Sequence, residues 1–284
     1  MPAPFASTRE RFIVQALQAI AAAKALNCTL HADGWIIELS RPLARTLVYG
    51  YTFDLNSASA TAVANDKAGM SALLDTKGIP HVPHHLVLSP TVLTAAPDAC
   101  ADLRNEQLHR MASAVTYPLV CKANQGSGGN LVFRVDSMPE LDKAADIIFT
   151  TQRALALSPY IDIQQEYRLV MLRGEVLLAY EKIRPTTRRK DPRHHWQHNL
   201  GRGSIPKLIP PETIKILAPL AAAAMHAGNL QVGAVDIINS AAGYQVLEIN
   251  AGIMLEHFAR LHEDGRKRAS AIYETLVEAC FDAR

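Results

Sequence analysis

Two acidic residues near the C-terminal end of the chain are spaced so that they can hold a cation. Residues 232–239 and 244–250 are rich in β-branched and apolar side chains, which predicts two antiparallel strands. Residues 241–243, Ala-Ala-Gly, predict a three-residue hairpin loop between them. In that register Asp236 lies directly opposite Glu248 at roughly 5 Å, where two carboxylates repel each other. A cation bound between them relieves the repulsion.

Asn250 is the third member of this candidate metal site, because side chains alternate along a strand and Asn250 shares the face of Glu248. Two carboxylates and an amide carbonyl suit Mg²⁺, with Mn²⁺ as a second choice. Protein-bound Mg²⁺ commonly takes its remaining ligands from substrate phosphates, so the site predicts nucleotide chemistry. The alternative is a solvated edge hairpin, although the apolar neighbours of Glu248 favour a strand covered on both faces.

A glycine-rich loop preceded by a lysine forms the second candidate site. Lys122 ends a predicted strand at 115–122, and the loop at 125–130, Gln-Gly-Ser-Gly-Gly-Asn, leads into another strand at 131–135. This differs from the Walker arrangement, in which the lysine and a helix follow the glycines. Glycines let backbone N–H groups approach phosphate oxygens closely, and the serine adds a hydroxyl donor. The predicted phosphate-binding residues of this flap are Gly126, Ser127, Gly128 and Gly129. An ordinary hairpin turn is the alternative, and Lys122 favours the flap.

A third candidate is Lys67, in the first turn of a predicted helix that Asn65 or Asp66 caps and Gly78 ends. The helix dipole disfavours a cation at this position by about 0.3 kcal/mol or more, and a bound anion reverses the penalty. The alternative is an exposed lysine that tolerates the dipole.

A predicted hairpin turning at Arg173-Gly174 places Glu166 and Arg168 on one face, and a basic stretch, residues 182–193, follows it. Guanidinium groups match phosphate and carboxylate oxygens in pairs, so this stretch could gather an anionic substrate. A solvated loop is the alternative, favoured for residues 188–190. Neither zinc nor nucleic acid is favoured, because the histidines that follow this stretch lack a fourth ligand and Trp196 is the one aromatic residue beside them.

Composition limits the class of protein. The chain has 284 residues, of which 49% are hydrophobic, enough for two or three packed units. Its net charge of +2 argues against a nucleic-acid or anionic membrane partner. Its four cysteines lack paired spacing, which favours a reducing compartment over a disulfide framework. The chain begins without a signal-peptide pattern, and its most apolar helical stretch is too short to span a bilayer. We therefore predict a cytoplasmic protein.

Three units are expected to position these residues, and the predicted fold class is α+β. Residues 1–64 predict a small α/β cap, with a helix over 8–25 and three short β-like runs. Residues 65–157 predict a unit that carries the glycine-rich loop, and residues 158–284 one that carries the metal hairpin.

Four strings in this order along the chain resemble the ATP-grasp superfamily. They are DKAxxxxLLxxxGIP, PLVCKANQGSGGN, NLGRGS and VDII…LEIN. Together, over residues 57–281, they are similar to the α-glutamate ligase (RimK-like) and cyanophycin synthetase branch. The resemblance implies an ATP-grasp fold, in which the cap and two α+β subdomains grip the nucleotide.

The resemblance also implies a role for individual residues. Lys67 and Lys122 would hold the phosphates of ATP, Tyr160 and Ile161 would form the adenine hinge, and Glu166 would bind the ribose. The implied Mg²⁺ ligands are Asp236, Glu248 and Asn250. The implied catalytic residues are Asn199 and Arg202, beside the γ-phosphate and acyl intermediate, and Arg168 and Arg184 on the substrate side.

The activity implied is that of an ADP-forming acid–amino-acid ligase. A small-molecule carboxylate would become an acyl phosphate, and an amine would then displace phosphate to form an amide or peptide bond. Amino acids or a small acidic compound are the expected substrates, and a dimer or tetramer is the expected assembly. Two alternatives use the same nucleotide site: a small-molecule kinase that stops at phosphoryl transfer, and a non-catalytic nucleotide sensor.

Overall fold

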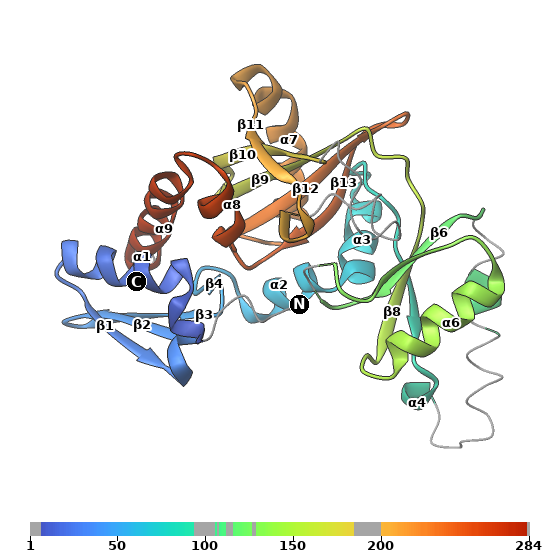
Figure 1. Cartoon of the computed structure of the whole chain (residues 1–284), viewed down its shortest axis with the longest axis horizontal. Helices are drawn as coiled ribbons and strands as arrows, with labels where there is room; N and C mark the ends of the chain where they lie inside the picture. Colours follow the sequence, from blue (N-terminus) through green and yellow to red (C-terminus); the bar gives the residue numbers. More distant parts are fainter. Residues whose placement is uncertain are drawn as a thin grey trace.

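The computed structural model describes residues 7–93, 106, 108–111, 116–126, 129–184 and 200–282, and only the backbone of Arg202. Within these residues the chain forms three antiparallel sheets, each in a different region of the molecule (Figure 1). The shortest helical segments are η1 (Thr8–Glu10), η2 (Ala32–Gly34), η4 (Leu200–Arg202) and α4 (Pro90–Leu93).

The N-terminal sheet and helix α1 (Phe12–Ala23) form the cap. The sheet has the order β1-β2-β3-β4, with the bounds β1 (Asn27–His31), β2 (Ile36–Arg41), β3 (Ala44–Tyr49) and β4 (Thr52–Phe53). Alternation along the strands buries Ile37, Leu39 and Val48 in a core shared with α1. The C-terminal helices α8 (Glu256–Leu261) and α9 (Gly265–Asp282) join this core. Both ends of the chain therefore pack together, with α9 beside α1 (Figure 1).

The second sheet carries the glycine-rich loop, which connects two of its neighbouring strands. Its order is β5-β8-β6-β7, with the bounds β5 (His85–Leu88), β6 (Leu119–Ala123), β7 (Val132–Val135) and β8 (Ala154–Pro159). Helix α6 (Met138–Phe149) packs on it and buries Leu141, Ala145 and Ile148. Every residue of β6 is buried, so Lys122 lies among apolar neighbours as predicted.

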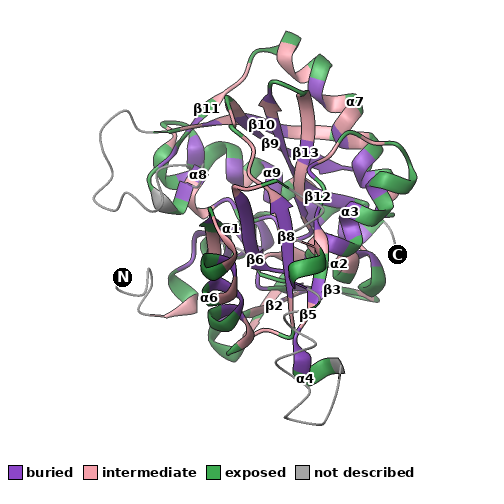
Figure 2. Ribbon diagram, turned by 90° about the vertical axis from the view of Figure 1, so that its right-hand side faces the viewer, coloured by how far each residue is buried: buried purple, intermediate pink, exposed green. Residues whose placement is uncertain are grey.

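The central sheet has five strands in the order β11-β10-β9-β12-β13. Their bounds are β9 (Gln165–Leu172), β10 (Glu175–Ile183), β11 (Ile205–Leu208), β12 (Val232–Ser240) and β13 (Gly243–Asn250). Leu169 and Met171 on β9 face a core formed with α2 (Ala58–Asn65), α3 (Lys67–Thr76) and α7 (Pro211–Ala227). Val170 and Leu172 face the core shared with the cap. Helices thus pack on both faces, and the inner strands β9 and β12 are mostly buried (Figure 2).

The hairpin β12–β13 differs from its predicted loop and still reaches the predicted pairing. Ser240 pairs with Gly243, so the turn has two residues where the sequence predicted three. A β-bulge then adds Leu247 to β13, and beyond it Asp236 pairs with Glu248. The shorter loop and the extra residue cancel, so the predicted loop was wrong and the predicted opposition of the two carboxylates is confirmed.

Helix α3 has the predicted start and stop. The Asp66 side chain accepts a hydrogen bond from Gly69 N at 2.7 Å, and Gly78 follows the helix with a φ of +65°. Met70 and Leu74 of α3 pack in the core of the central sheet, although the sequence groups this helix with the second unit. The boundaries 1–64, 65–157 and 158–284 stay a prediction.

The mixture of helices and antiparallel sheets confirms the α+β class. Within the described parts of the chain, every helix is too short or too polar to serve as a membrane span.

Candidate active site

Four strands of the central sheet place a row of polar side chains side by side. Asp236 on β12 pairs with Glu248 on one side and with Arg168 of β9 on the other. Arg168 pairs in turn with Tyr180 of β10. Residues two positions along a strand share its face. This adds Glu166, Lys182 and Asn250 to the same face of the sheet.

Within this row, Asp236 is held by two cationic side chains. Arg168 donates from Nε to Asp236 Oδ1 at 2.7 Å and from Nη2 to Asp236 Oδ2 at 2.6 Å. Lys182 Nζ lies 2.9 Å from Asp236 Oδ2 and 2.5 Å from Glu166 Oε1. Arg168 and Lys182 therefore neutralise the Asp236 carboxylate, a role that the sequence predicted for a metal ion alone.

Burial and pairing move the two carboxyl pKa values in opposite directions. Burial alone would raise the pKa of Asp236, but Arg168 and Lys182 reverse the effect and lower it to about 2. Burial raises the pKa of Glu166 to about 7, against the opposing charge of Lys182. Asp236 is thus firmly ionised, whereas Glu166 changes its protonation near neutral pH.

The donor set fits a divalent ion that completes its coordination with phosphate and water. Glu248 and Asn250 line the cavity described below, with Asn250 Nδ2 3.4 Å from Glu248 Oε1. Arg168 and Lys182 contact both oxygens of the Asp236 carboxylate. A carboxylate has about four lone-pair sites, so these contacts leave about one for a cation. Among the described residues, no three acidic, histidine or cysteine side chains converge as a metal cluster. An ion here would take most of its ligands from elsewhere, which is usual for Mg²⁺.

The two predicted phosphate-binding lysines face this row from the second sheet and from α3. Lys67 Nζ donates to Gly126 O at 2.8 Å, so the glycine-rich loop is attached to the start of α3. Lys122 is 7% exposed, and burial lowers the pKa of its ammonium group to about 8, while the charge of Glu248 opposes that shift. A bound polyphosphate would raise this pKa again, because an adjacent anion favours the protonated amine.

These residues surround one cavity of about 560 Å³. Lys67, Lys122, Gly126 and Gly129 lie on its walls, together with Tyr160, Ile161 and Glu166. The backbone at Tyr160 is fixed by its N–H, which donates to Pro118 O at 3.0 Å. The structure therefore brings the predicted phosphate, hinge and ribose residues to one space, as an extended nucleotide requires.

Several predicted site residues are not placed in this cavity. Arg184 is exposed, does not line the cavity, and lies with Nη2 3.5 Å from Ile163 O. Ser127, Gly128 and Asn199 lie outside the described residues, as does the side chain of Arg202. Leu200 and Gly201 line the cavity, so the backbone of the NLGRGS string reaches it.

The structure adds residues to the site that sequence reasoning missed. Lys182 joins Glu166 to Asp236, and its position two residues after Tyr180 on an apolar strand was the available signal. Trp35, Tyr49 and Tyr51 of the cap line the far end of the cavity. No local pattern marks these aromatic residues, because their place depends on how the cap packs against the rest of the chain.

A comparison with family profiles decides the family. The RimK-like ATP-grasp domain matches residues 64–267, well over half of the chain. The chain belongs to the RimK-like ATP-grasp family. The resemblance stated from the four strings is therefore confirmed, and so is the ATP-grasp fold. No curated protein sequence matches this RimK-like chain.

Solved structures similar to this RimK-like protein include D-alanine–D-alanine ligases. The enzyme from Bacillus anthracis matches with a TM-score of 0.58 at 17% identity, over 80% of this chain and 69% of that one. Its complex with ATP matches with a TM-score of 0.56 at 16% identity, over 80% and 68%. The enzyme from Coxiella burnetii matches with a TM-score of 0.56 at 19% identity, over 80% and 60%. At these identities the likeness concerns the fold.

Proposed function

We propose that this RimK-like protein is an ATP-dependent carboxylate–amine ligase that acts on amino acids or a small acidic compound. One observation carries the proposal. A single cavity joins the predicted phosphate-binding lysines Lys67 and Lys122 to Glu248 and Asn250 of the β12–β13 hairpin, and it continues past them to the cap. A ligase needs such additional space beside the nucleotide, because its carboxylate and amine must both reach the γ-phosphate end.

The nucleotide would lie between the second sheet and the central sheet. Its base would bind at Tyr160 and Ile161, its ribose at Glu166 and its phosphates at Lys67, Lys122 and the glycine-rich loop. Glu248 and Asn250, with Asp236, would hold Mg²⁺. When bound, the ion would neutralise phosphate charge and polarise the γ-phosphoryl group.

The reaction would have two steps, phosphoryl transfer and then amide formation. A substrate carboxylate oxygen attacks the γ-phosphorus, the bond to the β-phosphate oxygen breaks, and ADP leaves. The amine nitrogen then attacks the acyl carbon, the bond to the phosphate oxygen breaks, and inorganic phosphate leaves as the nitrogen loses a proton. The protein supplies position and charge, and none of its side chains becomes a covalent intermediate.

The glycine-rich loop would keep water from the acyl phosphate. Gly126 and Gly129 line the cavity, and Lys67 holds Gly126 O at 2.8 Å. A phosphate that attracts Lys67 would draw this loop over the reaction centre, where water would otherwise hydrolyse the mixed anhydride. Family membership and the ligase neighbours support ATP-dependent amide-bond formation in general.

ADP release from MgATP, measured against a matrix of amino acids and short peptides, tests the proposal. Hydroxylamine is added in parallel, because it converts an acyl phosphate to a hydroxamate. The expected result is ADP release with at least one carboxylate and a hydroxamate of that acid. A stable phosphorylated product would indicate a kinase, and nucleotide binding without ADP release a sensor; both results would overturn the ligase.

Glu248→Gln separates catalysis from folding. The change keeps the shape of the side chain and removes the charge at the candidate metal site. We expect ADP release to fall at least 100-fold with an unchanged circular dichroism spectrum. Glu175→Gln, an exposed carboxylate at the start of β10, is the matched control. Equal turnover in the Glu248→Gln variant would contradict the assignment.

A further inference from the structure

The cap end of the cavity has a wall of aromatic and apolar side chains. Trp35 is 36% exposed, Tyr49 61% and Met254 36%, and all three line the cavity together with Tyr51 and His257. The rings of Trp35 and Tyr49 meet edge-on, with centroids 6.0 Å apart. Large apolar side chains grouped in a reaction cavity are the usual lining of a ligand site.

Arg11 holds the two backbone segments that carry these rings. It is 2% exposed and donates from Nη2 to Gly34 O at 2.5 Å and from Nη1 to Gly50 O at 2.9 Å. Its guanidinium carbon lies 4.8 Å from the ring centroid of Trp35 and 5.0 Å from that of Tyr51. An arginine buried against carbonyls and ring faces fixes the orientation of both rings before any ligand arrives.

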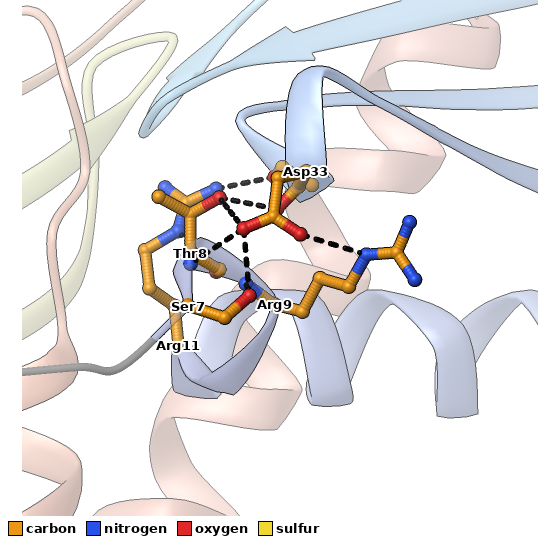
Figure 3. A network of polar contacts seen from close by, with 6 residues as sticks. Ser7, Thr8, Arg9, Arg11 and Asp33 are labelled. Carbon is orange, nitrogen blue, oxygen red and sulfur yellow. Dashed lines mark hydrogen bonds and ion pairs between the residues drawn. The ribbon is translucent and has the colours of Figure 1, made fainter.

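A second set of contacts fixes the turn before Trp35 (Figure 3). Asp33 accepts from Ser7 Oγ at 2.7 Å and from Thr8 N at 3.2 Å, and it forms an ion pair with Arg9 at 3.1 Å. Thr8 Oγ1 also donates to Asp33 O. Asp33 has a φ of +54° and Gly34 one of +82°, so these contacts stabilise a left-handed backbone at this turn. The aromatic wall is therefore a preorganised surface.

The wall adjoins the candidate metal hairpin. Ile253 N donates to Tyr51 O at 2.8 Å, three residues after Asn250. Gly252 lies against the same segment, since a Cβ built there would be in ordinary contact with Tyr51 Cβ at 3.6 Å and Thr52 Oγ1 at 3.5 Å. A substrate group bound at the wall would thus lie beside the end of β13.

The described lining of the wall contains no carboxylate, ammonium or guanidinium group. Its described lining residues are Trp35, Tyr49, Gly50, Tyr51, Thr52, Gly252, Met254 and His257. Burial lowers the pKa of His257, and the charges of Arg260 and Arg168 add to the effect. An apolar side chain placed against these rings would be stabilised by leaving water. A carboxylate there would lose hydration against uncharged rings, because the Arg11 cation behind them is already hydrogen-bonded to the carbonyls of Gly34 and Gly50.

From this geometry we infer that one substrate of the proposed ligase is an amino acid with a large apolar side chain, aromatic in the first place, which binds against Trp35, Tyr49 and Tyr51. The inference rests on the proposed function and replaces its broad substrate class by a narrower one. The flat rings of the wall match an aromatic side chain in edge or offset-stacked contact.

Kinetics with the full-length protein and MgATP test the inference. ADP release is compared for L-phenylalanine, L-leucine, L-aspartate and L-glutamate, each offered with the other amino acids as partners. We expect kcat/KM to be at least tenfold higher for phenylalanine than for glutamate. Trp35→Ala should remove most of this preference through KM. Leu47→Ala is the matched control, because Leu47 is 41% exposed on the same face of β3 as Tyr49 but does not line the cavity.

Direct binding keeps this test separate from the test of the ligase. In a Trp196→Phe background, Trp35 is the chain's only tryptophan, and its fluorescence reports a ligand at the wall. Phenylalanine binding without ADP release would contradict the ligase and would support only the binding of an apolar amino acid at the wall. ADP release with acidic amino acids but not apolar ones would overturn the inference alone. Absence of phenylalanine binding in both assays would overturn it as well.

Discussion

The two ends of the cavity are built in different ways. At the hairpin end, Glu166, Arg168, Lys182 and Asp236 form a buried network of opposite charges on neighbouring strands. At the cap end, Trp35 and Tyr51 are uncharged and are positioned by Arg11, whose described contacts are with backbone carbonyls and rings. With Lys67 and Lys122 on the facing wall, the first end suits a polyanion, and the second end suits an apolar group.

This difference predicts how substitutions at each end would affect stability and substrate affinity. A charged group in the hairpin network balances its neighbours, so its removal leaves an uncompensated buried ion. A ring at the cap end carries no charge, so its loss leaves no unpaired buried ion and should change substrate affinity more than folding. The following predictions would break or sharpen this contrast.

The largest effect is expected for Asp236→Asn. The change removes the carboxylate that both Arg168 and Lys182 contact, and breaking one partner of a buried pair typically costs about 4 kcal/mol. Urea unfolding measures the loss. Glu175→Gln, exposed on β10, should change stability by less than about 0.5 kcal/mol. A loss below about 1 kcal/mol for Asp236→Asn would show that Arg168 and Lys182 do not depend on the Asp236 carboxylate for charge compensation.

The pH dependence of stability should follow Glu166. Its folded pKa of about 7 lies above its ordinary value of 4.5, so the folded state retains a proton between these values. The resulting stabilisation is complete below about pH 4.5 and is lost as the pH rises through 7, by about 3 kcal/mol in all.

Lys182, Asp236 and Glu248 act on the Glu166 carboxyl, so the comparison is made between the wild type and Glu166→Gln at each pH. Denaturant unfolding between pH 5 and 8 (roughly the window in which a carboxyl of this pKa titrates) should show a falling difference between the two proteins. A constant difference would place the carboxyl at its ordinary pKa.

At the cap end, Arg11→Met should cost about 2 kcal/mol, because it leaves the buried carbonyls of Gly34 and Gly50 without this donor and retains most of the apolar stem. Thermal unfolding measures the loss. Arg9→Met is the matched control, since the Arg9 side chain is 62% exposed in its ion pair with Asp33. Equal losses of stability in the two variants would contradict the role of Arg11 in holding the carbonyls of Gly34 and Gly50.

The smallest effect is expected for Glu256→Gln. Glu256 accepts from Phe12 N at 2.8 Å and Ile13 N at 3.1 Å, so a residue of α8 caps the start of α1. Loss of the charge at a helix N-terminus should cost about 1 kcal/mol. Glu263→Gln, exposed after α8, serves as the reference in the same thermal unfolding series. An unchanged midpoint would mean that α1 is held by packing alone.

Much of the hairpin end was predictable from the sequence, because strand alternation is local. Glu166 with Arg168, and Glu248 with Asn250, are spaced two residues apart and share a face wherever their strand pairs. The opposition of Asp236 and Glu248 was also predicted, although the loop was one residue too long. A bulge leaves no clear pattern in the sequence, because it adds a residue without changing the composition of the strand.

The ion network was not predictable from the same patterns. It requires β9 to lie between β10 and β12, which brings Arg168 to Asp236 across a separation of 68 residues. The order of strands in a sheet is chosen by which apolar faces can be buried together. The sequence likewise places Lys182 in a basic stretch, and only the strand order brings it to Glu166 and Asp236.

The sequence by itself determined the chemistry of the nucleotide end: two lysines, a glycine-rich loop and an acid–acid–amide set in the order of the RimK-like ATP-grasp family. Only the tertiary structure decided that Lys182 completes a charge network and that the aromatic wall of the cap closes the other end of the cavity. The reason is physical. Periodicity and spacing act over a few residues, whereas the packing of the cap on the C-terminal helices depends on apolar burial between opposite ends of the chain.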